Sequence, residues 1–410
     1  MLQENPFISQ GDTPHVYVTQ GLDPYENTQA ALSHMDLSGL PGKRVLLKPN
    51  AGRVAHPCQG ITTHPSVVAA AIDAFRAVDA EVAVGESPIT GVKTMDAFVS
   101  TGIAAVAQKR GCPLIDMDAR PAVEVAIEGG EALDRIQVCP EVLEYDLIVS
   151  IPVMKMHMHT GVTLAVKNMK GCLWRRSKVQ LHMLPPIPGN DHKPINVAIA
   201  DMASVLRPHL SIIDGSIGME GLGPSAGRAK ELGAVVVGVD AFAADAVACA
   251  LMGTRAEEVP HLAIGSERGY GTIDLNKIHV TPNHWRDWTK AFARPPENLD
   301  MTFPNIQVLD NNSCSACQST LLLFLKQYQK QLFDYYPDET PVHIAIGKGH
   351  TELPEGTLCI GNCTAKQRSK GLFVTGCPPV VSEILMTLTG DVTVEPGPRA
   401  GPQKADESPA

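Results

Sequence analysis

Features that would tie this chain to a membrane or to nucleic acid are missing from its sequence. No segment approaches about 18 uninterrupted apolar residues, the length that a membrane-spanning helix needs. The N-terminal segment MLQENPFISQGD lacks the basic start and the apolar stretch of an export signal. The formal net charge is −10 and no basic block offsets it, which argues against nucleic acid and against an anionic membrane surface as partners. We therefore expect a cytoplasmic protein.

Aromatic residues are also scarce, at 5%, whereas the hydrophobic content of 44% and the charged content of 19% are ordinary for a globular protein. No classical nicotinamide-binding fingerprint occurs. The chain has 410 residues, which is more than a single hydrophobic core usually organises, so two or three domains are expected. In a reducing compartment, the 10 cysteines are more often buried apolar residues or metal ligands than disulfides.

Short β-branched runs alternate with longer Ala-rich stretches from Val16 to about Pro296. The expected strands cover residues 44–50, 81–87, 145–152, 210–216 and 234–240, and the expected helices cover 64–78 and 240–253. Strands that alternate with helices predict an α/β fold with a largely parallel sheet. Ligands of such sheets bind at the carboxyl ends of the strands.

A proline-rich linker, marked by Pro295, Pro296 and Pro304, divides the chain. Residues 1–296 are expected to form an α/β domain that binds an anionic substrate. Residues 305–394 are expected to form a smaller, flavodoxin-like α/β domain. The tail, residues 395–410, is rich in proline, glycine and charge and is expected to be disordered.

A dense set of polar residues follows the expected strand at 145–152. Lys155 and His157 share one face if that strand continues, and Lys167 and Lys170 share a helical face. The residues expected to act in catalysis are Lys155, His157, Lys167 and Asp214. The residues expected to bind substrate are Lys48, Asn50, His64, Ser87, His159, Asn168, Lys170 and His182. Together these side chains predict a donor-rich site for a carboxylate, a phosphate or an enolate-like anion.

A glycine-rich segment, GSIGMEGLGPSAGR, follows Asp214. We expect it to be a loop whose backbone N–H groups can approach an anion closely. The segment matches neither a Walker motif nor a Rossmann motif, so the prediction depends on the polar residues around it. Further along, Asp240 is expected to cap the helix at 240–253.

The order of LKPN, KMHMHTGVTLAVKNMKG and IIDG with GLGP resembles the domain-of-unknown-function family numbered 362. The resemblance spans roughly residues 44–271 and is most specific at KMHMHTGVTLAVKNMKG. It implies that these polar positions line one site, but it implies no reaction. Members of the family often carry iron–sulfur modules.

The cysteines fall into two groups. Those of the first domain, Cys58, Cys112, Cys139, Cys172 and Cys249, are scattered without ligand-like pairing, as is typical of small buried side chains. Those of the second domain, Cys314, Cys317, Cys359, Cys363 and Cys377, are close together in the chain. Zinc accepts four thiolates, but structural zinc sites usually take two closely spaced pairs. Iron–sulfur clusters are also held by four thiolates and tolerate this wider spacing. A zinc site and a reduced dithiol stay open as alternatives.

Three pieces of the second domain resemble the cluster domain of [NiFe]-hydrogenase small subunits. They are CSACQSTLLLFLK, CIGNC and FVTGCPPVVSEILMTL, in that order, and the related subunit of respiratory complex I shares the Gly-Cys-Pro-Pro turn. The resemblance implies that Cys314, Cys317, Cys363 and Cys377 hold one [4Fe–4S] cluster. Cys359 has no counterpart as a ligand, so we expect it in the core.

The leading functional hypothesis is an iron–sulfur oxidoreductase that couples a [4Fe–4S] cluster to a small anionic substrate. The alternative is a non-redox isomerase or lyase whose lysines and histidines hold a metal or an organic cofactor, with an accessory cluster. A third hypothesis is an electron-transfer or maturation protein, but it leaves the polar residues unexplained. A ferredoxin-like redox partner, a homodimer and a flavin are each compatible with the sequence, although no feature demands any of them.

We predict that Ala in place of any one of Cys314, Cys317, Cys363 and Cys377 abolishes or converts the EPR signal of the cluster, because four thiolates hold it. Cys359→Ala is the matched control and should leave the signal intact. The measurement is EPR with iron and sulfide analysis of anaerobically purified protein. Zinc without iron or sulfide in that protein would contradict the assignment.

Overall fold

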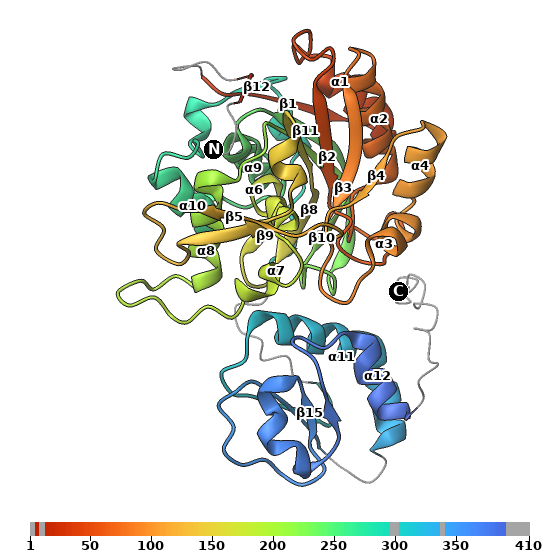
Figure 1. The fold of residues 1–410 in the computed structure, drawn as a ribbon, viewed down its shortest axis with the longest axis vertical. Coiled ribbons are helices and arrows are strands. Elements are labelled where there is room, and N and C mark those ends of the chain that lie inside the picture. The colour runs from red at the N-terminus through yellow and green to blue at the C-terminus, as the bar shows by residue number, and fades with distance from the viewer. Residues whose placement is uncertain (1–4, 8–12, 296–302, 337–340, 391–410) are drawn as a thin grey trace, which may run out of the picture. The chain divides into compact units, whose positions relative to one another are not determined.

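The computed structural model describes residues 5–7, 13–295, 303–336 and 341–390 (Figure 1). The chain divides into two compact units, Met1–Glu297 and Asn298–Ala410, which we call the large unit and the small unit. Both are α/β structures, which confirms the fold class expected from the sequence. Pro296 of the predicted linker and the predicted disordered tail, residues 395–410, lie outside the described residues.

A ten-stranded mixed sheet forms the centre of the large unit. Its main path runs in the order β12 (His279–Thr281), β1 (His15–Gln20), β11 (Arg228–Gly238), β10 (Leu210–Glu220), β7 (Leu147–Ile151), β2 (Arg44–Pro49), β3 (Glu81–Glu86) and β4 (Leu114–Asp116). Neighbours from β10 to β4 are parallel, whereas β11 is antiparallel to both β1 and β10. Off this path, β8 (Val153–His157) pairs with β10, and β9 (Gly161–Thr163) pairs with β8. The sheet is therefore largely parallel where the predicted site residues lie.

Both faces of this sheet are apolar, as expected for a sheet covered by helices on both sides. In β2, Val45 and Leu47 belong to one hydrophobic cluster, whereas Leu46 belongs to the other. The first cluster includes side chains of α1 (Pro24–Leu32), α2 (Pro65–Arg76), α3 (Thr94–Ser100) and α4 (Ile103–Lys109). The second includes side chains of α5 (Glu141–Glu144), α8 (Pro194–Val205), α9 (Ala241–Leu251) and α10 (Pro260–Glu267). The central strands β2, β3 and β7 are thus buried apart from the first residue of β2 and of β3, and their polar side chains lie near the strand ends.

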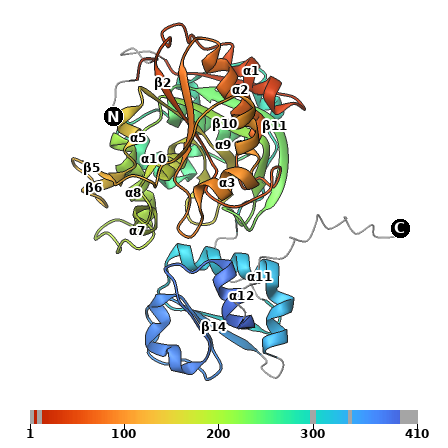
Figure 2. The same ribbon diagram turned by 45° about the vertical axis from the view of Figure 1, so that its right-hand side comes forward.

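A separate hairpin of β5 (Val123–Ala126) and β6 (Arg135–Val138) lies beside α8 (Figure 2). Asp201 of α8 fastens its turn, because the carboxylate accepts hydrogen bonds from the amides of Ala132 at 2.6 Å and Leu133 at 2.9 Å. Arg268 pairs with the same carboxylate at 2.6 Å. This buried acid therefore has a structural role outside the site.

The glycine-rich segment that follows Asp214 is a loop only in its second half. Residues 215–220 belong to strand β10, where the expected loop was wrong, whereas residues 221–227 form the loop between β10 and β11. Strand β10 continues from Leu210 to Glu220 and forms a hairpin with β11, interrupted by one bulge. A Cβ atom at Gly218 would lie 2.7 Å from the carbonyl oxygen of Met154 in β8. The physical reason for these glycines is therefore the close approach of two backbones.

The small unit is built on a four-stranded parallel sheet. Its elements are β13 (Ile306–Asp310), α11 (Ser315–Tyr335), β14 (Val342–Ile346), β15 (Leu358–Ile360), the 3-10 helix η5 (Asn362–Lys370), β16 (Phe373–Val374) and α12 (Val381–Thr389). The strands follow one another in chain order, without the reversal of order found in flavodoxin sheets. Cys359 of β15 is fully buried with Ala345 and Leu353, as the sequence predicts.

A buried carboxylate fixes the short helix that carries two of the predicted site residues. This helix, α6 (Ala165–Asn168), is followed by the 3-10 helix η1 (Met169–Cys172). Asp245 of α9 is fully buried and accepts hydrogen bonds from the amides of Ala165 at 2.7 Å and Val166 at 3.0 Å. Burial raises the pKa of Asp245 to about 8. Asp240 immediately precedes α9 and accepts hydrogen bonds from the amides of Phe242 and Ala243, which confirms the predicted helix cap.

We predict that Asp245→Ala lowers the free energy of unfolding of the large unit by about 1–3 kcal/mol, because two buried amides lose their acceptor. The folded-state pKa of about 8 lies above the unfolded value, so the contribution of Asp245 is lost as the pH rises through 8. The deficit of the variant should therefore be larger at pH 5.5 than at pH 8.5.

Urea unfolding followed by tryptophan fluorescence measures this change, since Trp174, Trp285 and Trp288 all belong to the large unit. Asp36→Ala is the control, because the side chain of Asp36 is exposed and should change stability by less than about 0.5 kcal/mol. An equal effect of both substitutions would contradict the capping role of Asp245.

Candidate functional site

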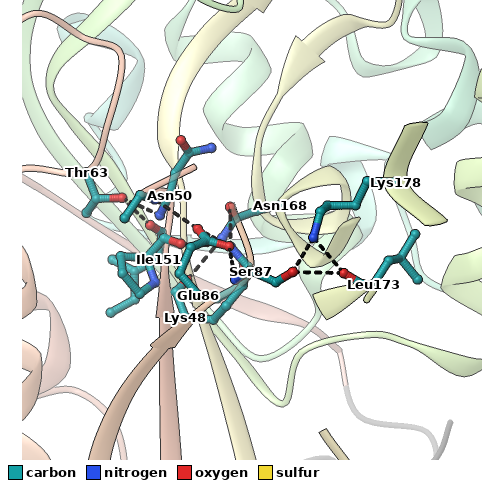
Figure 3. Close-up of polar contacts among 12 residues, drawn as sticks. Lys48, Asn50, Thr63, Glu86, Ser87, Ile151, Asn168, Leu173 and Lys178 are labelled. Carbon is teal, nitrogen blue, oxygen red and sulfur yellow. Dashed lines mark hydrogen bonds and ion pairs between the residues drawn. The ribbon is translucent and has the colours of Figure 1, made fainter. Parts of the chain in front are cut away.

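A buried ion pair lies at the carboxyl ends of β2 and β3 (Figure 3). Lys48 Nζ donates to Glu86 Oε2 at 2.9 Å, and the two side chains are 1% and 3% exposed. Lys48 also donates to the carbonyl of Pro49 at 2.8 Å and to Asn168 Oδ1 at 3.2 Å. The other carboxylate oxygen of Glu86 accepts from the amide of Ser87 at 2.9 Å. These hydrogen bonds offset the desolvation of the two buried charges.

Asn168 and Gly171 fit closely around this pair. Asn168 Nδ2 donates to the carbonyl of Lys48 and to Ser150 Oγ, each at 3.1 Å. A Cβ atom at position 171 would lie 2.4 Å from Lys48 Cε and 2.5 Å from Glu86 Oε1. The glycine of the KNMKG motif is therefore required because a side chain there would push the ion pair apart.

Lys155, in β8, is held by neutral acceptors. Its Nζ donates to the carbonyl of Ile61 at 2.7 Å and to Asn50 Oδ1 at 3.3 Å, and the residue is 3% exposed. Burial, and after it the positive charges of Arg53 and Lys48, lower the pKa of Lys155 to about 7. Lys155 can therefore gain or lose a proton near neutral pH.

Three histidines and two lysines come together next to Lys155. They are His157, His159, Lys167, Lys170 and His182. The Nδ1 atom of His157 accepts from the amide of His159 at 3.2 Å, and their ring centroids are 5.9 Å apart. Lys170 Nζ is hydrogen-bonded to His182 Nε2. Burial, followed by repulsion within the group, lowers the pKa of His157, Lys167 and His182 strongly. Burial also lowers the pKa of Lys170 to about 7.

Ser87 connects this region to another buried lysine. Its hydroxyl donates to Asp118 Oδ1 at 2.5 Å and is itself hydrogen-bonded by Lys178 Nζ. Lys178 also donates to the carbonyl of Leu173 at 2.8 Å and lies 3.8 Å from Asp118. Burial lowers the pKa of Lys178, and the charge of Asp118 opposes this effect. Ser87 is thus held by protein groups rather than left open.

We use the name basic cluster for Lys48, Lys155, His157, His159, Lys167, Lys170, Lys178 and His182. Carboxylates pair with two of its members, Glu86 with Lys48 and Asp118 with Lys178. Within the residues that the structure describes, no ion pair reaches Lys155, Lys167 or Lys170. Buried cations are costly unless an anion compensates them, so the basic cluster is arranged to receive negative charge.

Asp214 and His64 are adjacent, and both contact the backbone. The carboxylate of Asp214 accepts from the amide of His64 at 2.7 Å and from the amide and hydroxyl of Ser216. His64 Nδ1 accepts from the amide of Ser66 and so caps helix α2. Burial raises the pKa of Asp214, although these hydrogen bonds act in the opposite direction. Both side chains therefore hold the loop that ends at α2, which is a positioning role.

Several residues that complete the site were not among those expected from the sequence to act in catalysis or to bind substrate, although Glu86 was noted with Ser87 among the polar residues at strand ends. Glu86 lies next to Ser87 at the end of a predicted strand, and this position could have identified it as a site residue. Gly171 belonged to the KNMKG motif, but its contact with the ion pair depends on the fold. Lys178 and His261 carried no signal, because only burial next to the basic cluster distinguishes them.

The four cysteines predicted as cluster ligands follow the carboxyl ends of strands in the small unit. Cys314 and Cys317 lie at the start of α11 after β13, Cys363 lies in η5 after β15, and Cys377 follows β16. A thiol–thiol hydrogen bond raises the pKa of Cys317 and lowers the pKa of Cys314. The charges of Cys363 and Cys377 also raise the pKa of Cys317, so all four sulfurs are electrostatic neighbours.

Within the described ranges, no group of three or more His, Cys, Asp or Glu side chains is placed to hold one metal ion. A single tetrahedral zinc ion would require sulfur atoms about 3.8 Å apart. An iron–sulfur cluster places several iron atoms between its thiolates and therefore separates them further. Four thiolates are a donor set found both in structural zinc sites and in [4Fe–4S] clusters. In the same part of the chain, no helix is both long and apolar enough to cross a membrane.

Comparison with protein families matches residues 45–250 to the domain of unknown function DUF362. A protein of Synechocystis sp. named thylakoid-associated protein sll1697 is 29% identical over 315 residues, which are 75% of this chain and 88% of that protein.

Among solved structures, the lactate racemase apoprotein from Thermoanaerobacterium thermosaccharolyticum is similar with a TM-score of 0.39 and 12% identity, over 81% of this chain and 68% of that one. A Thermotoga maritima protein is similar with a TM-score of 0.36 and 16% identity, over 57% of this chain and 60% of that one. At these TM-scores no substrate or reaction transfers to this chain.

We predict that Glu86→Gln lowers the free energy of unfolding of the large unit by about 3–5 kcal/mol, because Lys48 is left as an uncompensated buried charge. The double variant Lys48→Met/Glu86→Gln removes both charges and should recover most of that loss. Glu257→Gln, in an exposed pair with Arg255, is the control and should change stability by less than about 0.5 kcal/mol. Additive losses in the double variant, measured by tryptophan-detected urea unfolding, would refute the coupling.

Proposed function

The chain belongs to the DUF362 family, and we propose that it is an enzyme that transfers protons to and from a small anionic substrate. The reaction belongs to the isomerase or lyase class. The substrate carries a carboxylate or a similar anionic group, and the basic cluster binds it. The negative charge that develops on the substrate during proton transfer is stabilised by the same lysines.

The observation that carries this proposal is that buried Lys155 and Lys167 and half-buried Lys170 lie close together, and that none of the three has a carboxylate partner among the residues that the structure describes. A surface lysine stays protonated near neutral pH and is a poor base. The pKa of Lys155 and the pKa of Lys170 are both lowered to about 7, where a general acid or base is most effective. The site thus combines anion binding with proton transfer.

The neutral acceptors around Lys155 support the same assignment. The amine donates to a carbonyl and an amide oxygen, so its orientation is fixed without an ion pair that would raise its pKa. When an anion binds nearby, the positive form of each lysine is favoured and its pKa rises. Binding of the anion therefore favours the protonated form of the lysine that later donates a proton to the substrate.

An iron–sulfur oxidoreductase is the second candidate, and the four neighbouring thiols of the small unit favour it. A [4Fe–4S] cluster held by Cys314, Cys317, Cys363 and Cys377 would supply one-electron transfer. The lysines of the large unit would then bind the compound that is reduced or oxidised. The two candidates differ in whether turnover requires the cluster.

We predict that the protein exchanges hydrogen for deuterium at the carbon next to the carboxylate or carbonyl of small 2-oxo and 2-hydroxy acids in D2O. Proton NMR measures the loss of signal. The rate should rise with pH through about 7, as Lys155 and Lys170 lose their protons. Lys155→Met should reduce exchange by about 10²–10⁴-fold, the usual contribution of a general acid or base.

Lys43→Met is the matched control, since the side chain of Lys43 is 52% exposed in the large unit. Exchange that persists in Cys317→Ala would favour the isomerase or lyase, whereas exchange that disappears with the cluster would favour the oxidoreductase. A protein that binds these acids and exchanges none of them would contradict proton transfer.

A further inference from the structure

Lys167 is the one lysine of the basic cluster whose single hydrogen-bond partner is a hydroxyl group, within the residues that the structure describes. Lys48 and Lys178 have carboxylate partners, Lys155 donates to two oxygen atoms, and Lys170 is bonded to an imidazole. Lys167 Nζ donates to Thr163 Oγ1 at 3.1 Å, and no other hydrogen bond to it occurs within the described part of the chain. Its amine therefore has neither a carboxylate nor an imidazole partner in the described part of the chain, only this hydroxyl.

The surroundings of Lys167 favour the neutral form of its amine. The residue is 8% exposed, and burial followed by the charges of Lys170 and Lys155 lowers its pKa strongly. A neutral amine has a free electron pair, and lysines that are desolvated next to other cations act as nucleophiles toward carbonyl carbon. Position also matters, because the cap by Asp245 holds the helix that carries Lys167.

A second observation at the same place is an unsatisfied imidazole. His261 of α10 is fully buried, and within the described residues neither of its ring nitrogens has a hydrogen-bond partner. Burial and the charge of Lys167 lower the pKa of His261 to about 3, although the nearby Thr160 backbone opposes this effect. Buried polar groups normally have partners, so an imidazole whose ring nitrogens lack a well-aligned one can exchange a proton with a group that binds beside Lys167.

We propose that Lys167 forms a Schiff base with a 2-oxo acid or a similar carbonyl compound that carries a carboxylate. This proposal rests on the proposed function, since the neighbouring lysines would bind the carboxylate. The electron pair of Lys167 Nζ attacks the carbonyl carbon, and the carbonyl oxygen takes a proton from Lys170. His261 takes a proton from the new C–N nitrogen and passes it to the hydroxyl group, which leaves as water while the nitrogen electron pair forms the C=N bond. In total, one amine, one carbonyl and the proton from Lys170 give one protonated imine and one water.

The chemical use of this step agrees with proton transfer. A protonated imine withdraws electrons from the adjacent carbon, so a C–H bond there becomes acidic. The electron pair of that bond moves into the C=N system when a base such as Lys155 removes the proton. Lys167 is thus proposed as the covalent catalytic residue, and His261 as a proton acceptor for it.

Reductive trapping tests the proposal without knowledge of the natural substrate. The full-length protein is incubated with pyruvate or glyoxylate and sodium cyanoborohydride, whose hydride converts an imine into a stable secondary amine. Intact mass spectrometry should show one adduct per chain, and peptide mapping should place it on Lys167. Lys167→Arg should lower the adduct at least tenfold, whereas Lys43→Arg, at an exposed lysine, should not change it.

His261→Gln should slow adduct formation about tenfold while pyruvate binding, measured by calorimetry, is unchanged. Wild-type protein that binds pyruvate but carries its adduct on other lysines, or none, would overturn the Schiff base and leave the proposed function standing. Protein that neither binds pyruvate nor exchanges deuterium would overturn the proposed function itself. Mapping on the wild-type chain decides the question even if Lys167→Arg fails to fold.

Discussion

One buried carboxylate, that of Glu86, joins segments of the large unit that are far apart in the chain. It accepts hydrogen bonds from Lys48 at the end of β2, from the amide of Ala51 in the following loop and from the amide of Ser87. Through Lys48 it also positions Asn168 of α6. Glu86 therefore holds three segments together. They are the loop after β2, whose Asn50 and Ile61 contact Lys155, the helix α6, which contains Lys167, and the end of β3 next to Ser87. Such a buried pair contributes little net stability but determines which groups must meet.

Around this anchor, the electrostatic character of the site follows from an imbalance of buried charge. The basic cluster contains five lysines, and two carboxylates pair with two of them. Of the remaining lysines, Lys155 and Lys167 are buried and Lys170 is half-buried, so little water reaches their charges. Their pKa values fall instead, so they spend part of the time as neutral amines at neutral pH. The same burial thus underlies the proposed anion binding, the proposed proton transfer and the proposed nucleophilic amine.

The sequence was sufficient for the fold class and for the main members of the site. Alternating strands and helices predicted the α/β sheet, and polar residues at strand ends predicted where Lys48, Lys155 and Ser87 would lie. The hairpin of β10 and β11 was missed because glycine-rich sequence is typical of loops. Here Gly218 is needed because the backbone of β8 lies too close to leave room for a side chain. That requirement comes from a neighbouring strand and leaves no local signal.

The individual roles within the site were less predictable than its location. Asp214 was expected to act in catalysis, but its carboxylate accepts from the amides of His64 and Ser216. His261 lies in an ordinary helical segment, and only its complete burial beside Lys167 brings it into consideration. Burial and hydrogen-bond partners depend on tertiary structure, so residue type and spacing alone could not assign these roles.

The placement of the four small-unit thiols has a consequence for how that unit unfolds. The four thiols belong to three different connections. Cys314 and Cys317 follow β13, Cys363 follows β15, and Cys377 follows β16. Any group bound to all four would cross-link three loops and so remove much of the conformational entropy of the unfolded chain. Loss of that group would then loosen the ends of the strands first, at the edge of the sheet where the loops meet. A group bound in this way would contribute stability to the small unit that a larger apolar core contributes in other domains.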